Sequence, residues 1–250
     1  WNHDNNCYEA SGLINRLLGI KRENGSMDPF KQFDGDLGSC VKCKDILSKF
    51  HVDPCASDEI VVPKPIVSGI RKKPLMVIGQ TPGLTEYRTG KPFQGQAGKG
   101  IRGELSNLGV HDFDREVFSS AVAKCFPGRK HRKVNDPFSK CEDRQPPAAM
   151  VRNCRQFLKR QVELADPAII ITLGSLALKA YLEMSGQQVS SPRLENYVGT
   201  AQEWGERKVI FFPHTSGSAR WLNNHSNKLL FGKAKNLLRI ALLESGVVNA

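Results

Sequence analysis

Four short apolar runs are spaced along the chain, at residues 75–78, 117–122, 168–173 and 209–212. Each is rich in β-branched, aromatic or other apolar side chains, and glycine or proline bounds most of them, which is typical of buried parallel strands. Between them, apolar residues recur at helical spacing, and we expect helices at 98–108, 148–164, 175–184 and 228–243. Strands that alternate with helices predict an α/β fold, a three-layer α/β/α sandwich around a four-stranded parallel sheet.

The N-terminal part differs from this pattern. Apolar residues at helical spacing predict a helix over residues 9–19, and the Gly- and Asp-rich stretch that follows predicts a loop. We therefore expect an N-terminal helical extension over residues 1–37 and one domain over residues 38–250, with a proline-punctuated linker at residues 61–70.

Composition narrows the class of protein. The chain has 250 residues, of which 40% are hydrophobic and 24% charged, enough to bury a core and too many for a disordered tail. The apolar runs fall far short of the ~20 residues that cross a bilayer, and the polar first residues have no signal-peptide core. These observations predict a soluble, cytoplasmic protein without a membrane partner, and we expect a monomer.

The charge points to a partner. Lys and Arg number 36 against 25 Asp and Glu, a net charge of +11. Basic residues near phosphates release condensed counterions, so nucleic acid is the leading partner, while a merely solubilising surface is the alternative.

Seven cysteines make an odd count, which favours metal ligands or free thiols over a disulfide framework. Cys40 and Cys43 form a C-x-x-C pair, a spacing that lets two thiolates reach one metal ion or cluster. A redox pair is the competing interpretation, but no strand precedes these residues, as a thioredoxin-like site requires.

The stretch from residue 79 to residue 98, GQTPGLTEYRTGKPFQGQAG, resembles the first motif of the uracil-DNA glycosylase superfamily, in particular its iron-sulfur branch, family 4. Ten residues of that motif are in register without a gap: Gly79, Pro82, Gly83, Glu86, Gly90, Pro92, Phe93, Gly95, Ala97 and Gly98. Lys124-Cys125, the block that starts at Cys154, and His214-Thr215-Ser216 are similar to later motifs. The resemblance covers about residues 40 to 220 and implies a DNA glycosylase domain.

The resemblance also implies a base pocket and its chemistry. The pocket residues that it carries over are Gln80, Thr81, Pro82, Gly83, Phe93 and Ala121. Phe93 offers a ring on which a flipped base stacks, and His214 can donate a hydrogen bond to the departing base. Because Gln80 and Thr81 stand where relatives carry acids, Glu86 is the candidate catalytic carboxylate. Ala121 replaces the Asn that reads the uracil edge.

A [4Fe-4S] cluster is implied at four cysteines: Cys40, Cys43, Cys125 and Cys154. The family's third and fourth ligands are closer together than Cys125 and Cys154, and Cys141 fits that shorter spacing. Cys154 carries the family's downstream sequence, so we expect an insertion within residues 134–147 and a spare thiol at Cys141. Zinc is the alternative cofactor, because four thiolates suit it equally well.

Two segments are candidates for DNA contacts. The first is a strip that begins at Lys124 and carries Arg129, Lys130, Arg132 and Lys133 without an acid. His131 in this strip invites comparison with a subfamily that crosslinks to uracil-DNA, but its offset from Cys125 differs. The second follows the last strand and resembles the minor-groove loop of mismatch-specific glycosylases, with Ser216, Ser218, Arg220 and Trp221 as its candidate contacts.

The leading hypothesis is thus a DNA glycosylase that excises a deaminated base, uracil first, and leaves an abasic site. One alternative is a glycosylase that removes a bulky modified cytosine from phage DNA, in anti-phage defence. Another is a catalytically weak DNA-binding sensor of such bases, which the replacement of acids by Gln80 and Thr81 favours.

Overall fold

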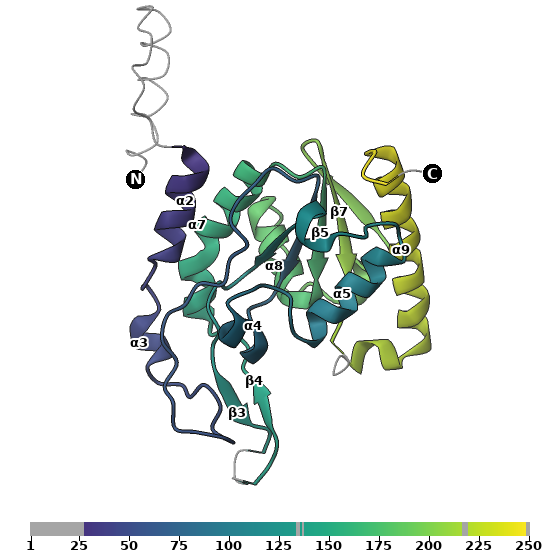
Figure 1. Cartoon of the computed structure of the whole chain (residues 1–250). Helices are drawn as coiled ribbons and strands as arrows, with labels where there is room; N and C mark the ends of the chain where they lie inside the picture. The colour runs from purple at the N-terminus through teal and green to yellow at the C-terminus, as the bar shows by residue number, and fades with distance from the viewer. Residues whose placement is uncertain (1–27, 134–135, 137, 217–219, 249–250) are drawn as a thin grey trace, which may run out of the picture.

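The structure, a computed structural model, describes residues 28–133, 136, 138–216 and 220–248. Five strands form its central sheet, in the order β2-β1-β5-β7-β6 (Figure 1). In chain order the strands are β1 (Leu75–Gly79), β2 (Val117–Ala121), β5 (Ile169–Leu173), β6 (Ala201–Trp204) and β7 (Arg207–Phe212). The four predicted strands are present and mutually parallel. The fifth, β6, pairs antiparallel with β7 at the sheet edge, and the prediction missed it because its side chains are only partly buried.

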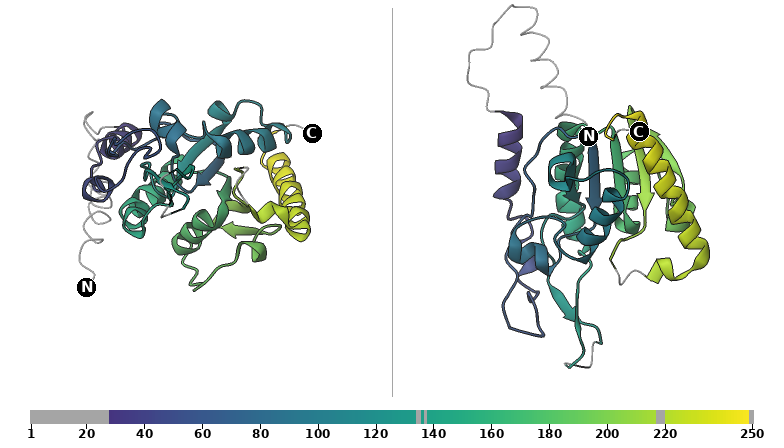
Figure 2. Two further views of the ribbon diagram at one scale, coloured as in Figure 1. Left: turned by 90° about the horizontal axis from the view of Figure 1, so that it is seen from below. Right: turned by 45° about the vertical axis from the view of Figure 1, so that its right-hand side comes forward.

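Helices cover both faces of this sheet. Those expected from the sequence are α5 (Gln96–Ser106), α7 (Ala148–Ala165), α8 (Gly174–Met184) and α9 (His225–Glu244). α7 and α8 lie on one face and α5 and α9 on the other, which gives the predicted three layers (Figure 2). Within the described residues, no helix combines the length and apolar character that a membrane span requires.

The shorter helices were not predicted. They are α2 (Pro29–Gly38), α3 (Lys44–Leu47), α4 (Leu84–Thr89), α6 (Phe113–Glu116) and the 3-10 turns η1 (Leu194–Asn196) and η2 (Arg220–Asn223). The expected helix at 9–19 lies outside the described residues.

Helix α2 corrects the prediction of a loop up to residue 37. The carboxylate of Asp28 accepts a hydrogen bond from the Phe30 N–H at 2.9 Å, and proline occupies the first helical position. This combination favours a helix start. Phe33 and Leu37, four residues apart, are buried in the main core, so packing holds α2 against the domain.

Two apolar clusters stabilise the fold. The larger one contains the sheet and the helices packed on it. The smaller one lies beside it, and Leu47, Val52 and Phe126 pack there around Cys43 and Cys125. The cysteine-bearing segments therefore have a small core of their own.

A two-stranded antiparallel hairpin extends from the body of the molecule, below α4 in Figure 1. Its strands are β3 (Arg129–His131) and β4 (Cys141–Asp143), and the register places Arg129 opposite Asp143 and His131 opposite Cys141. The hairpin overlaps the segment 134–147 in which we expect an insertion, and the insertion itself stays a prediction.

Candidate active site

A cavity of about 770 Å³ lies at the carboxyl ends of β1, β2 and β7. In parallel sheets ligands bind at this edge, and the volume is that of a small-molecule site. All six predicted pocket residues line it, together with Glu86, His214 and Ser216. The structure thus brings into one cavity side chains that lie more than 130 positions apart in sequence.

The turn after β1 forms one wall of the cavity. The backbone N–H groups of Val122 and Ala123 donate to the carbonyls of Gly79 and Gln80, at 2.9 and 3.0 Å. The Thr81 hydroxyl donates to the Cys125 carbonyl at 2.9 Å. These bonds fix the turn against the segment that follows β2.

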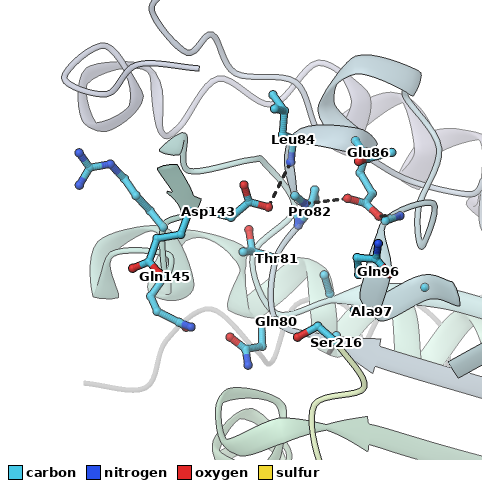
Figure 3. A pocket seen from close by; sticks show the side chains of 18 of the residues that line it. Gln80, Thr81, Pro82, Leu84, Glu86, Gln96, Ala97, Asp143, Gln145 and Ser216 are labelled. Atoms are coloured by element: carbon cyan, nitrogen blue, oxygen red, sulfur yellow. Dashed lines mark hydrogen bonds between the residues drawn. The ribbon is translucent and has the colours of Figure 1, made fainter. Parts of the chain in front are cut away.

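Glu86 lies next to this turn, and both of its carboxylate oxygens accept hydrogen bonds from backbone N–H groups. Oε2 accepts from the Gly83 N–H at 2.9 Å (Figure 3). Oε1 accepts from the N–H groups of Gln94 and Gly95 at 2.9 and 2.6 Å. The side chain is buried. A carboxylate held in this way shapes two loops and has little capacity left to bind a water molecule.

Phe93 adopts a left-handed backbone conformation, with φ of 54°. Its ring covers Gly79, where a β-carbon would lie 3.1 Å from the ring, and it makes an edge contact with Phe113, with centroids 6.0 Å apart. α5 passes so close that a β-carbon on Gly98 would lie 1.9 Å from the Phe93 carbonyl oxygen. Close backbone packing therefore holds the ring at the cavity wall.

His214 follows β7 and is partly buried. The Ser216 N–H donates to Nδ1 at 3.3 Å, and the Ser216 hydroxyl lies 2.8 Å from the same atom. Because Nδ1 accepts, the ring proton is assigned to Nε2. Burial lowers the pKa of His214, so the ring is neutral near pH 7. The Thr215 hydroxyl donates to the Ala97 carbonyl at 2.7 Å and joins this loop to α5.

Asp143 is one of several cavity-lining residues that the sequence did not indicate, and it carries an acidic group. Its Oδ2 accepts from the Leu84 N–H at 3.3 Å (Figure 3). Its Oδ1 lies 3.2 Å from Arg129 Nε. The side chain is 44% exposed. Burial raises its pKa, against the opposing effects of the Leu84 N–H and Arg129, and Glu86 raises it further. Asp143 and Glu86 thus approach the turn from opposite sides, and Asp143 keeps access to solvent.

The basic strip is more neutral than its sequence indicates. Lys130 and Arg132 both pair with Glu142 across the hairpin, at 3.5 and 3.4 Å. Arg129 pairs with Asp53 at 2.8 Å besides Asp143, while Lys133 lies 3.9 Å from Asp136. Exposed pairs are weak, so Lys130, Arg132 and Lys133 stay available to phosphates, whereas the half-buried Arg129 supports the hairpin.

Lys124 is buried, contrary to its expected place at the start of a solvent-facing strip. Its ammonium donates to the Ser120 hydroxyl, the Ala121 carbonyl and the Gln161 side chain. Burial lowers the pKa of Lys124 to about 7. This residue therefore fixes the end of β2 beside the pocket.

Residues of the second DNA-binding segment are only partly described. Ser218 lies outside the described residues, as does the side chain of Arg220. Trp221 is partly buried and packs against the main core. Its role in DNA binding stays a prediction.

The four cysteines of the implied cluster are free thiols, and Cys43, Cys125 and Cys154 are buried. Burial and the neighbouring cysteines raise the pKa of Cys125 to about 12. Four free thiols, three of them buried, form a donor set that fits an iron-sulfur cluster and also suits zinc.

Cys141 corrects the expectation of a spare thiol, because it is disulfide-bonded to Cys55. The odd cysteine count gave no indication of this pairing, which joins residues 86 positions apart. The disulfide also removes Cys141 from the set of free cysteines, which supports Cys154 as the fourth cluster ligand.

Comparisons with known proteins agree with this site. The sequence model described as "Uracil DNA glycosylase superfamily" matches residues 68–239. Together with the fold and cavity, this match defines a DNA N-glycosylase, a hydrolase of N-glycosyl bonds that acts on DNA. The chain belongs to the uracil-DNA glycosylase superfamily.

Several relatives carry the name type-4 uracil-DNA glycosylase. The protein of Sulfurisphaera tokodaii is 26% identical over 216 residues, which are 86% of each chain. That of Saccharolobus solfataricus is 29% identical over 217 residues, 85% of this chain and 88% of its own. That of Thermotoga maritima is 31% identical over 156 residues, 62% of this chain and 69% of its own.

Proposed function

We propose that the protein flips a deaminated base, uracil first, into the cavity and hydrolyses its N-glycosidic bond to leave an abasic site. The observation that carries this proposal is a cavity bordered by a neutral histidine and a solvent-accessible carboxylate, His214 and Asp143. The names of the relatives support uracil as the first substrate.

His214 supports departure of the base. As the bond between C1′ of the sugar and the base nitrogen breaks, its electron pair stays with the base, and a carbonyl oxygen of uracil gains negative charge. A neutral imidazole with its proton on Nε2 can donate a hydrogen bond to that oxygen. The bonds from Ser216 to Nδ1 keep this tautomer.

Asp143 supports attack of water on C1′. The ionised carboxylate orients the water, accepts its proton and stabilises the positive charge on the sugar. We assign this role to Asp143 in place of Glu86, which three backbone N–H groups occupy. Glu86 then acts as a positioning residue for the turn that carries Gly83.

The proposed substrate is tested with DNA duplexes that each carry one uracil, hypoxanthine, thymine mismatch or bulky modified cytosine, followed by alkaline strand scission. We expect scission of uracil-DNA, lost with His214→Ala. If the protein binds these duplexes but none of the lesions gives scission, the proposed glycosylase activity is contradicted and the sensor hypothesis is favoured.

A modified cytosine is the second candidate substrate, as in defence against phage DNA. Ala121 ends β2 at the cavity wall, and its small side chain leaves space at the pyrimidine edge of a flipped base. A site without an edge-reading amide rejects fewer bases.

Ala121→Asn should narrow the substrate range toward uracil, because its amide restores hydrogen bonds to the pyrimidine edge and fills the space. The measurement is the ratio of kcat/KM for uracil to that for each other base in the duplex panel. We expect this ratio to rise by about tenfold or more, the effect of a good hydrogen bond. An unchanged ratio would show that another residue reads the base.

We further propose that Cys40, Cys43, Cys125 and Cys154 hold a [4Fe-4S] cluster. When bound, the cluster supplies a structural crosslink between the N-terminal segment, the end of β2 and α7. This crosslink fixes the residues that follow β2, including the carbonyl that accepts the Thr81 hydroxyl.

Protein purified without oxygen should be brown and contain close to four iron and four sulfide per chain, as a four-iron cluster requires. Cys43→Ser should remove the colour and lower the thermal midpoint, whereas Cys141→Ser should keep the iron. Iron analysis and absorption spectra check both variants. Zinc in place of iron, or bleaching only by Cys141→Ser, would contradict the assignment.

A further inference from the structure

A second group of side chains that can bind a metal ion lies at the loop end of the hairpin ladder, apart from the four free cysteines. It comprises Cys55, from the loop before β1, with His131 at the end of β3 and Cys141 at the start of β4. The sulfurs of Cys55 and Cys141 lie 3.7 and 3.9 Å from His131 Nδ1. The proposed reaction uses none of the three.

A backbone oxygen completes the group. The Ser139 carbonyl oxygen lies 3.2 Å from His131 Nδ1 and 3.5 Å from Cys55 Sγ. Tetrahedral zinc with ordinary bond lengths separates sulfur from nitrogen by about 3.6 Å, sulfur from oxygen by about 3.6 Å and nitrogen from oxygen by about 3.3 Å. The observed separations match these values closely, so the donors need little rearrangement around one ion.

In this structure the sulfurs of Cys55 and Cys141 are joined in a disulfide, so they are not yet the two thiolates that a metal site needs. Metal binds thiolates, so the two sulfurs must be reduced and then separate to about 3.8 Å. Cys55 is exposed, and it lies on an irregular loop that can accommodate this shift. His131 lies opposite Cys141 in the ladder, and the hairpin therefore presents those two ligands together.

We propose that the reduced protein binds one zinc ion through Cys55 Sγ, Cys141 Sγ and His131 Nδ1, with the Ser139 carbonyl oxygen or a water molecule as fourth ligand. Binding releases the two thiol protons and requires the imidazole proton on Nε2. The metal and the disulfide exclude each other, since both use the same two sulfurs.

Either state fixes the hairpin to the loop at Cys55. Apart from this link, the described residues contain one side-chain ion pair between the hairpin and the loop at Cys55, that of Arg129 with Asp53. The same hairpin presents Asp143 to the cavity. Zinc therefore replaces the disulfide as the link that positions the hairpin under reducing conditions.

The test uses the full chain, reduced with a phosphine, separated from the reductant without oxygen and titrated with Zn²⁺ against a chromogenic chelator. Because the other cysteines also bind zinc, the measured quantity is the difference between variants at equal iron content. We expect the wild type to bind one more zinc per chain than Cys141→Ser or His131→Ala, and His111→Ala, an exposed histidine elsewhere, to match the wild type.

Two further measurements keep the test decisive. His131→Ala retains the disulfide, so its folding can be verified by circular dichroism in the oxidised state. Co²⁺ in place of Zn²⁺ should give tetrahedral visible bands with thiolate charge transfer, lost on oxidation to the disulfide. Equal zinc content in wild type, Cys141→Ser and His131→Ala, or no cobalt bands in the reduced wild type, would overturn the proposal.

Discussion

Asp143→Asn should lower the single-turnover rate constant for uracil excision by about 10²- to 10⁴-fold, the usual contribution of a positioned acid or base. Asparagine preserves the size of the side chain and can still accept from the Leu84 N–H, so the turn should keep its conformation. Binding of uracil-DNA, measured by fluorescence anisotropy, should change little. The matched control is Asp136→Asn, on the same hairpin but outside the cavity lining.

The pH profile separates a chemical role of Asp143 from a structural one. Only the ionised carboxylate accepts a proton, so the rate should rise as pH increases through the Asp143 pKa. Burial raises that pKa, which places the midpoint above the ordinary value of about 4 for aspartate. Asp143→Asn should abolish this acidic limb, and His214→Gln should retain it at a lower rate. If the Asp143→Asn variant keeps the acidic limb of the wild-type profile, another group titrates there and the assignment of Asp143 is wrong.

Gly98→Ala should destabilise the fold by about 3 kcal/mol or more, because the new β-carbon meets the Phe93 carbonyl oxygen at 1.9 Å and backbone must move. For a domain of this size the thermal midpoint should fall by about 6–12 °C. Calorimetry or circular dichroism measures this effect.

Gly103→Ala is the matched control for this prediction. It lies in the same helix, α5, and its β-carbon would meet nothing within 4 Å. Helix propensity alone then favours alanine by up to about 1 kcal/mol, so this variant should melt at or above the wild-type midpoint. Equal losses in both variants would show that the close approach of α5 to Phe93 is not what requires glycine.

The sheet could be predicted because its strands are buried on both faces. Ile169, Ile170 and Ile171 belong to one such strand, and such runs differ visibly from the amphipathic helices between them. The strand β6 lacks this signal, because its side chains alternate between exposed and partly buried. α2 had a usable signal in Asp28-Pro29 and in the spacing of Phe33 and Leu37, but the surrounding glycines and aspartates concealed it.

The site could be predicted only as far as contiguous motifs extend. Gly83, Phe93 and His214 lie in such motifs, and the structure brings them to one cavity. Asp143 could not be found in this way, because its position depends on the hairpin register and on an ion pair with Arg129. For Lys124 the sequence gives the charge, whereas its three hydrogen-bond partners come from the tertiary fold.

The hairpin also couples two properties of the proposed site. It carries Asp143, and with Arg129, Lys130, Arg132 and Glu142 it lines one side of the cavity, whereas most of the remaining lining follows β1 or belongs to the start of α5. Changes within residues 129–143 would therefore alter the position of the carboxylate and the outline of the cavity together. In this chain, reactivity and substrate shape are encoded in part by one short excursion between β2 and α7.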